Sequence, residues 1–461
     1  GSATLGPGGL EVIKLGPREV DGSPEGEFDT GEHTALTRNA YRIASDFPVV
    51  AYQFNPLENA SVFSNDASLL IPKEALVFPG VGTAPAYVAL GWPQTIAATD
   101  DPNTNFNPIN PIHLRAFLTV AGTEDDTTVT VVPSARVVAG GPVPGSQPGQ
   151  PINVTLSAHD VLNLESGDFA ADFTGSLVYA DKPVAVFVGG EASDAPAWTT
   201  LSERFCCADH LEDQLPPVRT AGKRFAVPHT PHRGDAVSAA GAAIGTIPEV
   251  EFVRVMATTE QGARITTSLP SPDDAITLTG RGDFHELAVF GDFMLESDAP
   301  VLVAQVMASQ QATSVKGQGL PGGDPSLLFI PPLEQARASY VFLTPDKYAF
   351  DFVTIVAPAG ATVLLDGQAV SEAICESAAA DGLTSAERGG PATHLVHRCQ
   401  PSFPTIDSFA VPPVIGLGTQ RDGVHRIESD QPVLVLVTGF DAFVSYAYAA
   451  GTDLREIAPP Q

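Results

Sequence analysis

The stretch Ser176–Gly190, SLVYADKPVAVFVGG, joins an acidic turn to a run of β-branched and small apolar residues. The order Asp, variable residue, Pro, Val returns in YRIASDFPVVAYQF (41–54), FMLESDAPVLVAQVM (293–307) and HRIESDQPVLVLVTGF (425–440). Aspartate caps a turn, proline fixes φ, and the run that follows suits a buried sheet. Each aspartate is therefore predicted to mark the entrance of an equivalent strand. These residues are Asp46, Asp181, Asp298 and Asp430.

Two further landmarks recur with the Asp-x-Pro-Val strands. A hairpin pattern, two alternating runs around a turn, precedes the last three of them, at 117–132, 252–267 and 352–365. An apolar residue leading into proline follows each strand, at Ile71-Pro72, Leu215-Pro216, Ile330-Pro331 and Ile457 to Pro460. The pattern predicts a single domain, 1–461, made of one half-repeat (about 9–72) and three full repeats (about 73–217, 218–332 and 333–460).

The composition favours an all-β fold. Only 17% of the residues are charged, whereas Gly and Pro number 42 and 41, which suits many short strands joined by turns. If each half-repeat forms one small antiparallel sheet, the chain has seven sheets, and their radial packing would be a seven-bladed propeller. Tandem β-sandwich domains are the alternative, because the same alternation and turn spacing serve them.

The charge balance restricts the partners. Acidic residues outnumber basic ones by 54 to 24, a formal charge of −30, and such a field repels phosphate backbones, so nucleic acid is not an expected partner. No apolar run reaches the roughly 18 residues that span a bilayer, so membrane insertion is not expected either. Gly1-Ser2 resembles the remainder of a cleaved tag, and we expect an export signal to have preceded it.

Four cysteines form an even, sparse set that suits an oxidising compartment. Cys375 and Cys399 flank an excursion whose first part, 374–391, is predicted to be a short surface helix or an ordered loop. We expect a disulfide to close this excursion at its base. The adjacent pair Cys206 and Cys207 could bridge each other, pair elsewhere or stay free. A metal site there is disfavoured, because His210 lacks a second spaced pair of ligands.

Other motifs give weaker signals. The sequence contains no Gly-x-Ser-x-Gly elbow, phosphate loop or His-Glu-x-x-His motif, so the common catalytic sets are missing. Glu124, Asp125 and Asp126 form the tip of a predicted hairpin and are weak calcium candidates, although solvated turn charges are the commoner role. Two Arg-Gly-Asp tripeptides, 233–235 and 281–283, could bind an integrin-like partner if exposed, while Gly-Asp is also ordinary turn chemistry.

The segment ADKPVAVFVGGEASDAPAW (180–198) and the later string CCADHLEDQLPPVRTAGKRFAVPHTP (206–231) resemble the N-terminal domain family of the IgG-Fc-binding mucus protein, which includes bacterial relatives. The resemblance extends over most of residues 30 to 460. It implies an exported binding domain without catalysis, and it singles out a signature that is also a candidate binding loop. The signature residues are Cys206, Cys207, Asp209, His210 and Glu212.

The leading hypothesis is an extracellular or cell-surface binding and adhesion module that recognises a protein or a glycan through loops on a rigid β scaffold. One alternative is a structural subunit of a surface layer or appendage, in which exposed strands make repeated self-contacts. Another is an uncharacterised hydrolase whose acidic face contains paired carboxylates. Apart from the calcium candidates, no cofactor is expected.

Overall fold

The computed structural model is all-β in its described part, and every pairing between its strands is antiparallel. The described residues are 2–6, 8–16, 20, 34–55, 65–76, 85–95, 115–168, 171–198, 203–204, 207–316, 319–371 and 374–457. Within them the helices are α1 (Arg233–Ala239), α2 (Ser385–Arg388) and the 3-10 helices η1 (Lys73–Ala75), η2 (Val218–Thr220), η3 (Gln310–Ala312) and η4 (Leu333–Gln335).

The strands fall into an N-terminal half-unit and three units. The half-unit contains β1 (Ala35–Thr37), β2 (Ala51–Phe54) and β3 (Ala67–Leu70). The first unit contains β4 (Tyr87–Val88), β5 (Ala116–Gly122), β6 (Thr127–Val132), β7 (Ile152–Leu156), β8 (Val161–Glu165), β9 (Leu177–Ala180), β10 (Val184–Ser193) and β11 (Asp209–Gln214).

The second unit contains β12 (Gly222–Val227), β13 (Glu251–Ala257), β14 (Ala263–Thr267), β15 (Ala275–Leu278), β16 (Phe284–Val289), β17 (Phe293–Met307) and β18 (Leu327–Phe329). The third unit contains β19 (Arg337–Thr344), β20 (Phe350–Pro358), β21 (Val363–Leu365), β22 (Gln368–Ala369), β23 (Cys375–Ala379), β24 (His394–Cys399), β25 (Phe403–Asp407), β26 (Val414–Thr419), β27 (Gly423–Asp441) and β28 (Val444–Ala449).

The three units share one pairing scheme, in which the Asp-x-Pro-Val strand takes part in two small sheets. Its first half gives the sheets β4-β9-β6-β7, β12-β17-β14-β15 and β19-β27-β21-β22. Its second half gives the sheets β8-β5-β10-β11, β16-β13-β17-β18 and β24-β20-β27-β28. The strand is interrupted as β9 and β10 in the first unit and continuous as β17 and β27 in the others.

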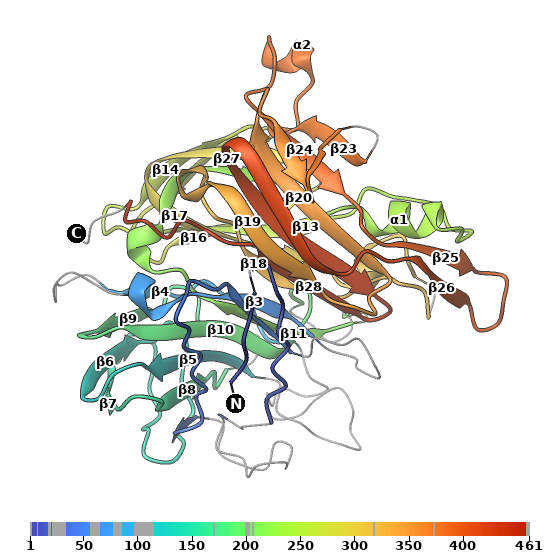
Figure 1. Ribbon diagram of the computed structural model, residues 1–461. Coiled ribbons are helices and arrows are strands. Elements are labelled where there is room, and N and C mark those ends of the chain that lie inside the picture. Colours follow the sequence, from blue (N-terminus) through green and yellow to red (C-terminus); the bar gives the residue numbers. More distant parts are fainter. Residues whose placement is uncertain are drawn as a thin grey trace.

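The pairs β2-β3 and β25-β26 add two further small sheets, and four inner strands meet at the centre of the molecule. Strand β11 contacts β3 and β18, and β28 also contacts β3 and β18, so these four strands close a ring. Figure 1 shows them between the upper and lower parts of the molecule. A seven-bladed propeller is not shown by this arrangement, because β17 and β27 each run through two sheets and, among the described residues, the central ring is closed by β3, β11, β18 and β28 alone.

Three of the four predicted strand-entrance aspartates bind the neighbouring strand in the same way. Oδ1 of Asp181, Asp298 and Asp430 accepts a hydrogen bond at 2.8 Å from a backbone N–H, whose donors are Thr128, Arg264 and Thr362 respectively. Asp181 lies in the turn between β9 and β10, whereas Asp298 and Asp430 lie inside the continuous strands. Asp46 is exposed in the segment before β2.

Proline turns the chain from an inner strand towards the next unit. Pro72, Pro217 and Pro332 are the N-cap residues of η1, η2 and η4, with φ of −66°, −61° and −68°. The fixed φ of proline suits this extended position directly before a helical turn. The fourth predicted proline exit, at 459–460, lies outside the described residues.

The hydrophobic interior continues from unit to unit. Phe252 and Met256 of β13 belong to the core of the first unit, and Leu436 and Ala447 of the third unit belong to the core of the second. In the half-unit, the ring centroid of Tyr52 lies 4.6 Å from that of Tyr448. Because apolar surface is buried across every boundary between units, the units stabilise one another.

Candidate functional site

Three of the signature residues, Asp209, His210 and Glu212, lie on β11, one of the four inner strands. Asp209 is 1% exposed, and its Oδ1 accepts a hydrogen bond at 3.0 Å from the backbone N–H of Asn65. Nε2 of His210 lies 3.7 Å from a carboxylate oxygen of Glu212, and the imidazole stacks on the ring of Phe117. The structure therefore places these residues in the interior polar contacts of the central ring.

The predicted disulfide between Cys375 and Cys399 is confirmed. It connects two directly paired residues of β23 and β24, both of them buried. The excursion that it closes contains α2, where Thr384 and Glu387 form a capping box and Gly389 ends the helix with φ 75°. Cys207 is disulfide-bonded, and Cys206 lies outside the described residues.

Asp66 connects three of the inner strands. One carboxylate oxygen accepts a hydrogen bond from the hydroxyl of Ser326 at 2.6 Å. The other accepts from the backbone N–H groups of Leu327 at 3.2 Å and Glu212 at 3.1 Å. Burial raises the pKa of Asp66 to about 7, although these hydrogen bonds act in the opposite direction. A single side chain thus satisfies polar groups of β11 and β18, two strands that have no backbone ladder with β3.

Asp213 and Gln214 of β11 make the same kind of connection. The carboxylate of Asp213 accepts a hydrogen bond at 3.2 Å from the backbone N–H of Phe329, and burial raises its pKa well above the usual value. Oε1 of Gln214 accepts from the backbone N–H of Ile71 at 2.8 Å. Side-chain oxygens therefore replace strand pairing between the inner strands, which explains why acidic residues occur on β11.

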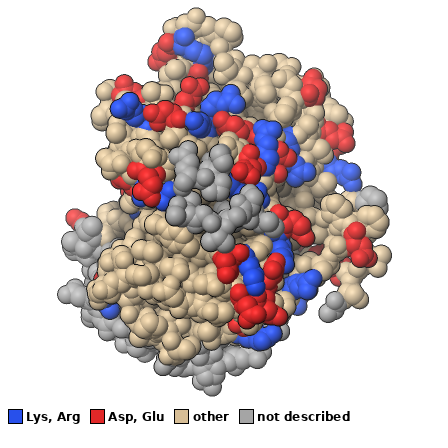
Figure 2. All heavy atoms as spheres, turned by 90° about the vertical axis from the view of Figure 1, so that its left-hand side faces the viewer, with Lys and Arg blue, Asp and Glu red and all other residues tan. Residues whose placement is uncertain are grey.

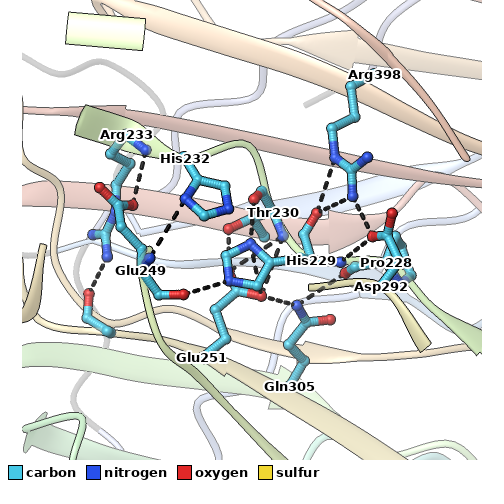
Figure 3. A network of polar contacts seen from close by, with 11 residues as sticks. Pro228, His229, Thr230, His232, Arg233, Glu249, Glu251, Asp292, Gln305 and Arg398 are labelled. Atoms are coloured by element: carbon cyan, nitrogen blue, oxygen red, sulfur yellow. Dashed lines mark hydrogen bonds and ion pairs between the residues drawn. The ribbon is translucent and has the colours of Figure 1, made fainter. Parts of the chain in front are cut away.

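A second polar network lies where the second and third units meet (Figure 3). His229, between β12 and α1, is 3% exposed. Its Nδ1 lies 2.6 Å from the carbonyl oxygen of Thr230, and its Nε2 lies 2.9 Å from that of Glu249. Each ring nitrogen therefore faces a backbone carbonyl oxygen. The buried carboxylate of Glu251 lies 3.8 Å from Nδ1.

Glu249 caps α1 from outside the helix. Its carboxylate accepts hydrogen bonds from the backbone N–H groups of Arg233 at 2.9 Å and Gly234 at 2.8 Å. The N-cap residue His232 supplies no side-chain cap, so Glu249 satisfies the free amides of the first turn. The imidazole of His232 instead stacks on that of His229, with ring centroids 4.7 Å apart.

Arg398 of β24 joins the third unit to this network (Figure 3). Its guanidinium donates to the carbonyl oxygen of His229 at 2.9 and 3.1 Å and to the carboxylate of Asp292. The backbone N–H of His229 also donates to Asp292 at 2.8 Å. No sequence pattern predicted this network. The one local signal is the string PHTPHR (228–233), in which Pro231 separates His229 from the adjacent His232 and Arg233.

Two cavities adjoin the sheets. One, of about 60 Å³, is lined partly by Asp213 and Gln214 of β11. The other, of about 190 Å³, lies between the second and third units and has mostly apolar walls together with Arg224 and His394. Neither is lined by the residues of the polar network around His229.

The Arg-Gly-Asp tripeptides are engaged in internal contacts. Arg233 is 2% exposed, and its guanidinium donates to two backbone carbonyl oxygens. The side chain of Arg281 is 6% exposed and pairs with Glu260. In the second tripeptide, the carboxylate of Asp283 accepts from the backbone N–H of Thr279 at 2.7 Å. Both guanidinium groups are buried, so the exposure that an integrin-like contact would require is not met.

The calcium candidates lie at the tip of the β5-β6 hairpin, as expected. The carboxylate of Glu124 lies 2.9 Å from Nζ of Lys73, and Asp125 accepts from the backbone N–H of Ala158 at 3.0 Å. Asp126 occupies the turn with φ 53°. Among the described residues, no group of three or more His, Cys, Asp or Glu side chains is arranged to hold a metal ion. Calcium binding at this tip stays a prediction.

The fold and the polar networks define a class: an all-β assembly of repeated strand units with buried acidic connections. The sequence matches the family model described as IgGFc binding protein over residues 66–439, and the chain belongs to this family. No curated protein matches it. An anti-sigma factor domain-containing protein from Clostridium clariflavum superposes with a TM-score of 0.13 and 9% identity, over 57% of this chain and 85% of that chain. A score this low carries no argument about the fold.

Proposed function

We propose that this chain is an extracellular, non-catalytic binding module whose ligand is a protein. The family match over residues 66–439 carries the proposal, because the family is described by its binding of immunoglobulin Fc. The buried disulfide between Cys375 and Cys399 supports an oxidising location. Among the described residues, no helix is long and apolar enough to cross a membrane.

The β25-β26 hairpin is the surface that we assign to ligand contact. It projects from the third unit at the right of Figure 1. Strand β25 is anchored close to the turn, because Ile406 is 6% exposed and its backbone N–H donates to the carbonyl oxygen of Ala240 at 2.8 Å. The tip of the hairpin carries Phe409 and Val411, which are 85% and 98% exposed. An anchored strand beside an exposed apolar turn is typical of a contact that another protein buries.

Electrostatic attraction alone is a weaker candidate for recognition. Figure 2 shows acidic and basic side chains intermingled over the upper part of one face, with few charged side chains over much of the lower part. The formal charge of −30 is therefore not gathered into one acidic patch on this face. Apolar contact at the hairpin tip, supported by the neighbouring strands, better suits a protein ligand.

The proposal is tested with immobilised immunoglobulin Fc, a panel of extracellular-matrix and mucosal proteins, and a glycan array. Wild type is expected to bind at least one protein. The double variant Phe409→Ser and Val411→Ser is expected to lose about tenfold or more in affinity without a change in melting temperature, because both side chains are exposed. The matched control is Phe47→Ser, which removes an equally large side chain that is 81% exposed before β2.

Two outcomes would contradict this function. Binding to glycans alone would exclude a protein ligand. If no member of the panel binds, the proposal of a binding module is contradicted. Equal loss of affinity in Phe47→Ser and in the hairpin variant would show that general surface apolarity, and not the hairpin, is responsible.

A further inference from the structure

Strands β8, β16 and β24 occupy equivalent edges in the three units. Each pairs on one side with the first strand of the unit's hairpin, namely β5, β13 and β20. The registers are fixed by the same backbone hydrogen bond just before each strand. These bonds are Gly122 N–H to Asp160 O at 2.8 Å, Ala257 N–H to Asp283 O at 2.9 Å and Ala359 N–H to Thr393 O at 2.8 Å.

Two of these three edges are covered by an additional antiparallel strand. Strand β1, which comes from the N-terminal half-unit, pairs with β8. Strand β23, which comes from the disulfide-closed excursion, pairs with β24. In the second unit, β16 is the terminal strand of its sheet within the described residues. The chain itself therefore shows what covers this kind of edge, and in its described part the edge of β16 has no such strand.

The outward backbone groups of β16 follow from the alternation of an antiparallel ladder. Because Asp283 bonds towards β13, the even-numbered residues Phe284, Glu286 and Ala288 direct their backbone groups away from it. The N–H of Phe284 donates to the carboxylate of Asp283. The N–H groups of Glu286 and Ala288 have no acceptor in the described part of the chain.

The side chains along this edge are also uncovered. Ala288 and the side chain of Glu286 are exposed, whereas every residue of the equivalent strand β8 is buried. Phe284 and Phe290, near the two ends of the strand, are 37% and 58% exposed. Exposed edge strands are templates for pairing with another chain. Phe284 and Phe290 offer apolar contacts at both ends of such a pairing.

We infer that the open edge of β16 binds an extended segment of the protein ligand as an additional antiparallel strand. The inference rests on the proposed function, since it names how that ligand is held. The strands on the equivalent edges, Ala35–Thr37 and Cys375–Ala379, consist mainly of small and uncharged residues. The formal charge of −30 favours a segment that also carries Lys or Arg, while Glu286 itself pairs with Arg254.

The test uses hydrogen–deuterium exchange of the full chain with a synthetic peptide of residues 34–40, TALTRNA, which contains the β1 strand and Arg38. At millimolar peptide, the amides of Glu286 and Ala288 are expected to exchange about tenfold more slowly, because each gains an acceptor. A scrambled peptide of the same composition is the control, and its addition is expected to leave both amides unchanged.

Variants at Ala288 separate edge pairing from other binding. Ala288→Pro removes an outward N–H that the ladder with β13 does not use, so folding is expected to be retained while protection by the peptide is lost. Ala288→Thr keeps the N–H and is expected to behave as wild type. Ala288→Lys also keeps the N–H, but its ammonium repels Arg38 of the peptide, so protection is expected to fall about tenfold. This variant tests edge pairing if Ala288→Pro does not fold.

Failure of this inference is distinguishable from failure of the proposed function. If immunoglobulin Fc or another panel protein binds wild type and Ala288→Pro equally, and the peptide protects neither amide, the edge proposal is wrong while the binding function stands. If no panel protein binds but the peptide protects Glu286 and Ala288, the edge stands without that function. Concentration-dependent dimers that Ala288→Pro abolishes would assign the edge to a second copy and overturn the proposal.

Discussion

Asp351 of β20 accepts hydrogen bonds from the hydroxyls of Ser402 at 2.6 Å and Tyr446 at 2.5 Å. Burial raises the pKa of Asp351 to about 7, although both hydroxyls lower it. The folded chain therefore keeps a proton that the unfolded chain has lost between about pH 4 and about pH 7, and the free energy of unfolding falls as pH rises through this window. Asp66, with a pKa of about 7, acts in the same direction.

Asp351→Asn is expected to reduce this pH dependence. The amide stays neutral, and both hydroxyl partners can either donate or accept, so the hydrogen bonds survive. Relative to wild type, the variant should gain stability on going from about pH 5 to about pH 8, by about 1 kcal/mol or more. Urea unfolding at the two pH values measures the difference in the free energy of unfolding between variant and wild type. Asp407→Asn, at an exposed position, is the control. An equal effect of Asp351→Asn at both values would contradict the assigned pKa.

The bent Asp-x-Pro-Val strands hold the two sheets of each unit together. In the second unit, the carboxylate of Asp298 binds the backbone of β14, while Pro300 and the residues after it continue β17 into the next sheet. The sequence predicted the strand, with the aspartate capping a turn at its entrance, whereas Asp298 lies inside the continuous strand and binds its neighbour. It did not predict that β17 and β27 would continue through the motif, because local alternation does not report how far a strand bends.

Removing the carboxylate should weaken each unit by a similar amount. Asp181→Ala, Asp298→Ala and Asp430→Ala each lose a hydrogen bond to a neighbouring backbone N–H, so each is expected to lower the free energy of unfolding by about 1 kcal/mol. Asp46→Ala, at the exposed fourth motif, is the matched control and should change stability little. Urea denaturation of the four variants compares them, and a large loss in Asp46→Ala would contradict the equivalence.

The units are held together by polar contacts between residues distant in sequence. Asp66 binds Ser326, 260 residues away, and Arg398 binds the carbonyl oxygen of His229, 169 residues away. Burial of the apolar boundaries supplies most of the cohesion, since the cores extend across units. The buried ions fix which surfaces meet, because an ion left without its partner in this interior is costly.

Arg398→Leu is expected to separate the second and third units before the rest unfolds. It leaves the carboxylate of Asp292, 7% exposed, without its guanidinium partner, at a cost of about 3 kcal/mol. Arg388→Leu is the control, because Arg388 pairs with Asp381 inside the local excursion around α2. Hydrogen exchange should show faster exchange in β13, β17 and β24 only for Arg398→Leu. Equal exchange patterns in the two variants would contradict this role.

The sequence by itself determined the all-β class, the repeated strand, the disulfide between Cys375 and Cys399 and the family, because period-two alternation, turn residues and cysteine spacing are local properties. Tertiary structure alone decided the ring of β3, β11, β18 and β28, the polar network around His229 and the open edge of β16. These depend on which distant strands become neighbours. A local pattern specifies that a residue lies in a strand, but not which chain segment, if any, will pair with it.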